Sequence, residues 1–181
     1  MRNIFAAGVF VVMAIAAVYV LSTMRPTAAN DAAPIAAPSG VVEEMRSVPD
    51  GWREYRSSMY LFSLLYPQEL AVNENPEGGN ATTITFQNTE KGVGFQIFVV
   101  PYQGQQVSEE RFKKDIPSGV RTDLVDIVVD GVTGAAFYSS NAALGETREI
   151  WFIKDGYLYE VTTLKPLDAW LKTVMQSWKF L

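Results

Sequence analysis

The sequence predicts an α+β domain in which helices flank an antiparallel sheet, preceded by one N-terminal transmembrane helix. Two Asp-Gly pairs, Asp130-Gly131 and Asp155-Gly156, each separate two apolar runs. Such pairs close two-residue hairpin turns, because the central positions need a positive φ. After Pro166 the apolar residues follow a helical spacing. Hairpins make neighbouring strands antiparallel, and a helix with one apolar face packs on such a sheet.

The first 25 residues are predicted to be a membrane anchor or a signal sequence. Ile4–Leu21 is apolar without interruption over about 18 residues, which is long enough to cross a bilayer as a helix. The flanking positive charges slightly favour a cytoplasmic N-terminus, which predicts a single-pass protein of the cell membrane with its C-terminal domain extracytoplasmic. A cleaved signal peptide is the alternative, with Thr27 and Ala29 as the small residues before the cleavage site. We favour the anchor because the apolar run is longer than a usual signal core.

Residues 26–48 are predicted to form a linker and residues 49–181 one folded domain. The linker is rich in Ala and Pro and has no apolar periodicity, as is typical of a partly extended tether. A domain of about 130 residues buries about two-thirds of its unfolded surface, so it needs neither a metal nor a disulfide to fold.

Strands, turns and one short helix alternate along the predicted domain. Tyr60–Tyr66 is predicted to be a strand that ends at Pro67, which has no N–H to donate. Ser108 is the expected N-cap of a helix over 108–115, whose first turn is acidic and whose end is basic. The other predicted elements are a loop over 75–80, strands over 82–87, 93–100, 124–129 and 132–139, a hairpin over 148–163, and a final helix with the apolar residues Leu167, Trp170, Leu171, Val174, Met175 and Trp178.

The hairpin over 148–163 is predicted to lie inside the sheet, covered on both faces. Closure at Asp155-Gly156 fixes which residues face each other, because side chains alternate along a strand. The predicted pairs are Lys154 with Tyr157, Phe152 with Tyr159 and Ile150 with Val161 on one face, and Ile153 with Leu158 and Trp151 with Glu160 on the other. Both faces are largely apolar, which favours burial on both sides.

Two short motifs resemble a known family. They are Tyr60-x-Phe62-Ser63-x-x-Tyr66-Pro67 and Leu158-Tyr159-Glu160-Val161-Thr162 followed by Trp178-Lys179-Phe180. Together with the strand order over 52–181, they resemble the PsbP-like fold of the photosystem II extrinsic protein PsbP and its non-photosynthetic bacterial relatives. The resemblance implies an α/β/α sandwich, and an extracytoplasmic domain that binds a protein assembly, with no general activity attached to the fold. None of the family's functional residues can be matched here, and the histidines through which some members bind metals are absent.

The composition excludes several kinds of chemistry. The 181 residues include no Cys and no His, which removes disulfides, thiolate nucleophiles, Ser-His catalysis and the commonest transition-metal ligand. We therefore expect no cofactor and no metal site. The net charge of −5 and the pI of about 4.8 argue against a nucleic-acid partner.

Glu149 and Glu160 form the one candidate acid–base pair, because the predicted register puts both on the Trp151 face. Such carboxylates more often pair with a basic residue, here Arg111 or Lys165. Other residues that suggest a site have structural explanations. Turn and rim positions are expected for Asp123, Asp126 and Asp130, and core positions for Trp151, Trp170 and Trp178.

The predicted binding surface consists of polar loops. If consecutive strands alternate in direction, the loops 75–80, 102–107 and 141–146 gather at one end of the sheet, and the tight turns gather at the other. Loops on a rigid scaffold are where binding residues concentrate. The predicted ligand or partner residues are Asn75, Glu77, Asn80, Tyr102, Gln103, Gln105 and Asn141.

The sequence thus predicts a membrane-anchored, extracytoplasmic, non-catalytic binding or interaction module, with an envelope protein as the expected partner and the membrane contacted through Ile4–Leu21. One alternative is an enzyme that uses Glu149 and Glu160 on an envelope glycan. Another is a carrier of a small ligand or a hard cation held by loop oxygens. An open cleft containing both Glu residues would favour the enzyme, and a closed core with a polar rim would favour the module.

Overall fold

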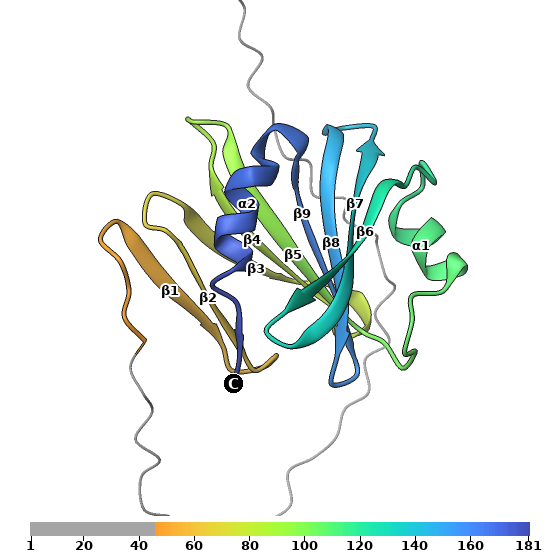
Figure 1. Ribbon diagram of the computed structural model, residues 1–181, viewed down its shortest axis with the longest axis horizontal. Helices are drawn as coiled ribbons and strands as arrows, with labels where there is room; N and C mark the ends of the chain where they lie inside the picture. The colour runs from red at the N-terminus through yellow and green to blue at the C-terminus, as the bar shows by residue number, and fades with distance from the viewer. Residues whose placement is uncertain (1–45) are drawn as a thin grey trace, which may run out of the picture.

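The computed structural model describes residues 46–181 (Figure 1). The predicted N-terminal membrane helix and most of the predicted linker lie outside the described residues. Within residues 46–181, none of the helices is long and apolar enough to span a bilayer.

The described chain folds into strands, two short α-helices and two 3-10 turns. In chain order they are β1 (Trp52–Ser57), β2 (Phe62–Pro67), β3 (Ala71–Pro76), η1 (Gly78–Asn80), β4 (Thr82–Asn88), β5 (Val93–Pro101), α1 (Glu109–Asp115), β6 (Thr122–Val129), β7 (Val132–Asn141), β8 (Gly145–Lys154), β9 (Tyr157–Leu164), η2 (Lys165–Leu167), α2 (Asp168–Met175) and β10 (Lys179–Phe180). Strand β3 was not predicted, because Val72 is its only large apolar residue and no alternation marks it.

The strands form two antiparallel sheets where the sequence predicted one. The larger sheet has seven strands in the order β3-β4-β5-β9-β8-β7-β6, and the smaller has the order β1-β2-β10. The α+β prediction is confirmed. Helix α2 and the small sheet pack on one face of the large sheet, and α1 lies on the other face (Figure 1).

The main core lies between the two sheets and is rich in aromatic rings. The Trp178 ring stacks on the Phe62 ring with centroids 4.2 Å apart. The same Trp178 ring meets Phe152 edge-on at 5.2 Å, and Phe152 stacks on Tyr159 at 5.0 Å. A second, smaller cluster under α1 contains the buried residues Phe112, Phe137, Trp151 and Leu158.

The hairpin registers are confirmed, and the final helix is corrected. The β8–β9 pairs, including Phe152 with Tyr159 and Trp151 with Glu160, are those predicted from the Asp-Gly turn. Helix α2 ends at Met175, so Trp178 lies beyond it, in the segment that leads into β10. The helix stops early because the chain must extend to pair β10 with β2.

Candidate functional site

The face of the large sheet that carries α1 also carries the candidate acid–base pair. In the β8–β9 register, Trp151 lies opposite Glu160 and Glu149 lies opposite Thr162, so both carboxylates are on the Trp151 face, as predicted. Helix α1 contributes Arg111 and Asp115, one helical turn apart, to the same place.

Glu149 is enclosed and satisfied by neutral donors. Its side chain is 3% exposed and accepts hydrogen bonds from Thr147 Oγ1 at 2.7 Å and from Thr162 Oγ1 at 2.6 Å. The Trp151 indole N–H approaches the same carboxyl at 3.5 Å. Burial raises the pKa of Glu149, and these hydrogen bonds offset only part of that rise. The Glu149 carboxyl therefore loses its proton at a higher pH than an exposed glutamate does, and its hydrogen bonds hold it in one orientation.

Glu160 belongs to a buried cluster with Arg111 and Asp115. It is 6% exposed, and Arg111 Nη2 lies 3.5 Å from its carboxyl oxygen. Arg111 also pairs with Asp115, and Asp115 shares a hydrogen bond with Glu160. The pKa of Glu160 is raised well above its usual value, first by burial and then by Asp115, so the single guanidinium does not compensate for both. The predicted pairing with Arg111 is confirmed. Lys165, the other candidate, binds Glu146 instead.

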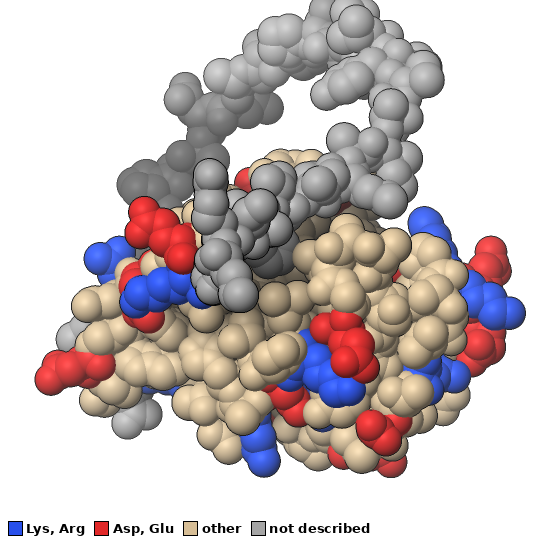
Figure 2. Space-filling view, turned by 90° about the horizontal axis from the view of Figure 1, so that it is seen from above, with Lys and Arg blue, Asp and Glu red and all other residues tan. Residues whose placement is uncertain are grey.

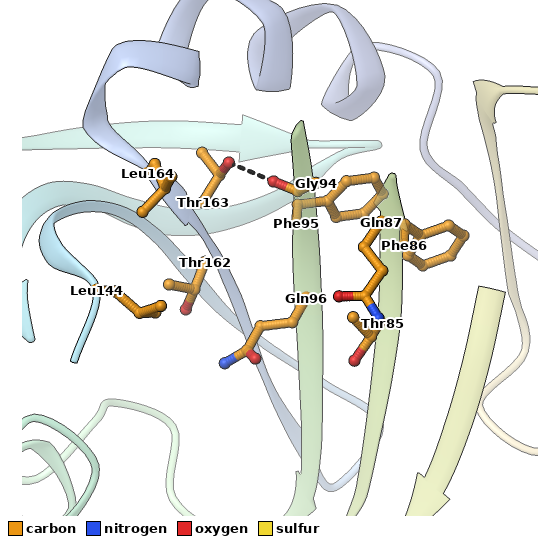
Figure 3. A pocket seen from close by; sticks show the side chains of 10 residues that line it. All are labelled: Thr85, Phe86, Gln87, Gly94, Phe95, Gln96, Leu144, Thr162, Thr163 and Leu164. Atoms are coloured by element: carbon orange, nitrogen blue, oxygen red, sulfur yellow. Dashed lines mark hydrogen bonds between the residues drawn. The ribbon is translucent and has the colours of Figure 1, made fainter. Parts of the chain in front are cut away.

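The enclosure limits what these carboxylates can do. A small hollow nearby is lined by β4, β5 and β9 and by Leu144 of the β7–β8 turn, and neither Glu149 nor Glu160 lines it (Figure 3). Thr162 lines this hollow and also donates to Glu149, so it lies between the hollow and the carboxyl. Among residues 46–181, no group of three or more acidic side chains is placed to hold a metal ion.

The predicted loop residues are placed unevenly. Gln103, Gln105 and Asn80 are exposed, whereas Asn75 and Glu77 are half-buried, and Glu77 accepts a hydrogen bond from Thr83 Oγ1 at 3.1 Å. They lie at the end of the large sheet where the β6–β7 and β8–β9 turns also lie. We call this group of loops and turns, residues 75–80, 102–107, 130–131 and 155–156, the loop end.

Tyr102 fixes the longer loop of the loop end. Its hydroxyl donates to the Gln106 carbonyl at 2.8 Å and accepts from the Ser108 N–H at 2.9 Å. Its own N–H donates to the Gly156 carbonyl at 2.7 Å, which ties this loop to the β8–β9 turn. Tyr102 therefore has a structural role, and the amide side chains of Gln103 and Gln105 remain on the surface.

Asn141 lies at the opposite end of the sheet, so the prediction that 141–146 joins the other loops is wrong. Strands β5 and β8 are both antiparallel neighbours of β9 and therefore run in the same direction. Helix α1 and the segment after it return the chain to the end where β5 begins, and this reverses every later strand relative to the prediction. Asn141 instead closes the β7–β8 turn, where its Oδ1 accepts from the N–H groups of Ala143 and Leu144.

Sequence reasoning missed three contributors to the carboxylate cluster. Asp115 could have been found from its spacing of four residues after Arg111 on a predicted helix. Thr162 could have been found from the register, since it lies directly opposite Glu149. Thr147 could have been found from the alternation of strand β8, since it precedes Glu149 by two residues.

Comparison with known proteins identifies the fold. No family model and no curated protein matches the sequence. The structure is similar to the solution structure of cyanobacterial PsbP (CyanoP) from Synechocystis sp. PCC 6803, with a TM-score of 0.53. The match covers 78% of this chain and 100% of that chain at 12% sequence identity. The chain has a PsbP-like fold. At this identity the likeness establishes the architecture alone, because one fold hosts many functions.

Proposed function

We propose that residues 46–181 act as a non-catalytic interaction module that binds a protein partner at the loop end. The observation that supports this is a contrast in exposure. Gln103 and Gln105 are exposed, whereas Glu149 and Glu160 are only 3% and 6% exposed. An acid–base pair has to reach the atoms between which it moves a proton, and these two carboxylates lie beneath other side chains.

The loop end has the properties of a recognition surface. Hydrogen bonds between the Tyr102 hydroxyl and the backbone of Gln106 and Ser108 restrain the loop over 102–107, so that loop loses little conformational entropy when a partner binds. Amide side chains such as those of Gln103 and Gln105 both donate and accept hydrogen bonds, which suits the mixed polar groups of a protein surface. Elsewhere on the molecule, acidic and basic side chains are interspersed over the face shown in Figure 2.

We further propose that the module works outside the cytoplasm, tethered to the membrane through Ile4–Leu21, and that its partner is a protein of the cell envelope. The length of the apolar run supports the tether. The PsbP-like fold supports a role outside the cytoplasm, because the resemblance carried by the sequence motifs implies an extracytoplasmic domain. A reporter that is active only in the cytoplasm, fused after Leu181, is expected to be silent. An active reporter would contradict this topology.

Site-specific photo-crosslinking in native membranes tests the binding surface. A photoreactive residue is placed at Gln103, in the loop end, and in a matched control at Ala142, which is exposed in the turn at the opposite end of the sheet. We expect a discrete crosslinked product from position 103 and not from position 142. Equal products from both positions, or a product from position 142 alone, would reject the loop end as the site.

Substitutions separate the module from the enzyme alternative. Replacing Asn75, Gln103 and Gln105 with Ala removes amide groups at the loop end. We expect this variant to fold normally and to lose the crosslinked product. Replacing Glu149 and Glu160 with Gln keeps shape and most hydrogen bonds, and we expect the product to remain. A carboxylate variant that folds but is inactive in cells, beside a fully functional loop variant, would favour a carboxylate-based enzyme.

A further inference from the structure

Strand β6 forms an open edge of the large sheet. It is the last strand in the sheet order and pairs only with β7 among the described strands (Figure 1). Its side chains are mostly exposed, including Leu124 at 54%, Val125 at 49% and Val128 at 70%. An edge strand that exposes several apolar side chains is unusual, because unpaired backbone groups next to apolar surface attract another strand.

The hairpin turn determines which backbone groups face outward. The two-residue turn at Asp130 and Gly131 makes Val129 and Val132 a hydrogen-bonded pair. Because such pairs alternate along an antiparallel ladder, Ile127 also bonds towards β7. The N–H and C=O groups of Asp126 and Val128 therefore point away from β7, towards the open edge.

The side chains of the same two residues are also available. Asp126 lies opposite Ala135 and Val128 opposite Thr133, so both side chains are on one face of the sheet. Asp126 is exposed, and no ion pair or hydrogen bond of its side chain is found within residues 46–181. This edge therefore presents a carboxylate and, two residues further on, an exposed valine, together with their free backbone groups.

A second copy of this chain is a poor partner for that edge. Strand β6 contains no Lys or Arg, so no register of two antiparallel β6 strands places a cation opposite Asp126, and the register centred on Asp126 sets the two Asp126 side chains opposite each other. Like charges placed directly opposite destabilise a pair of strands, and the net charge of −5 adds repulsion between whole chains. The irregularity between Thr122 and Val125 also ends regular pairing on that side. A basic, extended segment suits the edge better.

We propose that β6 accepts an extended segment of a partner protein as an added antiparallel strand, in which a Lys or Arg faces Asp126 and an apolar residue two positions away faces Val128. Backbone hydrogen bonds to Asp126 and Val128 provide affinity in this mode, and the alternate side chains provide specificity. The proposal rests on the backbone and side chains of Asp126 and Val128 and on neither Gln103 nor Gln105, so it does not depend on the function proposed above.

Two synthetic peptides test the proposal on the full 181-residue chain in mild detergent. The first is a fluorescently labelled heptapeptide of sequence TVTKTVT, and the second is TVTETVT, which differs only in the charge at its centre. Fluorescence anisotropy at low salt measures both affinities. We expect the Lys peptide to bind about tenfold more tightly, since one arrangement opposes unlike charges and the other like charges. The Asp126→Lys variant is expected to reverse this order.

Proline substitution tests the backbone contact. Val128→Pro removes an N–H that points to the open edge and leaves the ladder with β7 intact, a position where edge strands tolerate Pro. We expect this variant to bind the Lys peptide at least about tenfold more weakly, whereas the matched Val128→Thr variant keeps the N–H and changes affinity by less than about threefold. Equal binding of the two peptides, no binding of either, or full binding by a folded Val128→Pro variant would overturn the proposal. If Val128→Pro does not fold, the charge reversal with Asp126→Lys decides.

Discussion

Replacing Trp178 with Ala is expected to be among the most destabilising single changes in the domain. The indole is 1% exposed and lies against the rings of Phe62, Phe152 and Tyr159. Its N–H has no hydrogen-bond partner among the described residues, so the loss comes from packing alone. Removal of such a ring costs about 3–5 kcal/mol. For a domain of this size, that lowers the melting temperature by about 10–15 °C.

Trp170 provides the matched control, because sequence spacing gives both tryptophans the same role. The structure leaves Trp170 half-buried, with one edge-on contact to Phe95 at 5.9 Å. Partial burial of one ring predicts a cost of about 1–2 kcal/mol for Trp170→Ala. Urea denaturation of both variants, followed by far-UV circular dichroism, measures the difference. A Trp170→Ala variant that is as unstable as Trp178→Ala, or more so, would refute the assignment of Trp178 to the centre of the core.

Three further changes test other contacts. Burial raises the pKa of Glu149, so folding favours its protonated form, and the associated stability is present at acid pH and lost as the pH rises through the raised pKa. Glu149→Gln should therefore flatten the decline in urea midpoint between acid and neutral pH, and an unchanged decline would contradict the assignment. Asp130 accepts hydrogen bonds from Lys179 Nζ and from the Phe180 N–H, so Asp130→Gly, which keeps the positive φ of the turn, should speed amide exchange at Phe180 while the β6–β7 hairpin stays protected. Ser108→Ala removes the N-cap of α1 and should lower the free energy of unfolding by about 1 kcal/mol, as measured by thermal melting. Ser118→Ala should lower it by less.

The sequence alone predicted the parts of this fold that depend on neighbouring residues. The Asp-Gly turns set the registers of two hairpins, because only a few residue pairs tolerate positive φ at both central positions. The N-cap at Ser108 depends on a contact with Arg111, three residues away. The same local rules placed Glu149 and Glu160 on one face, so the two residues of the candidate pair were found without the structure.

Tertiary structure decided how these local units are arranged. Strands β5 and β9 are far apart in the sequence, and their pairing fixes the direction of β8 and thereby moves Asn141 to the opposite end from Gln103. Pairing of β10 with β2 ends the last helix early and places Trp178 in the core, while Trp170 remains at its margin. Helix α1 encloses Glu160 by bringing Arg111 and Asp115 over it. The spacing of apolar residues along the chain does not predict these contacts, because they depend on which surfaces far apart in the sequence bury each other. A hairpin turn or the apolar face of a helix can be buried against several different partners.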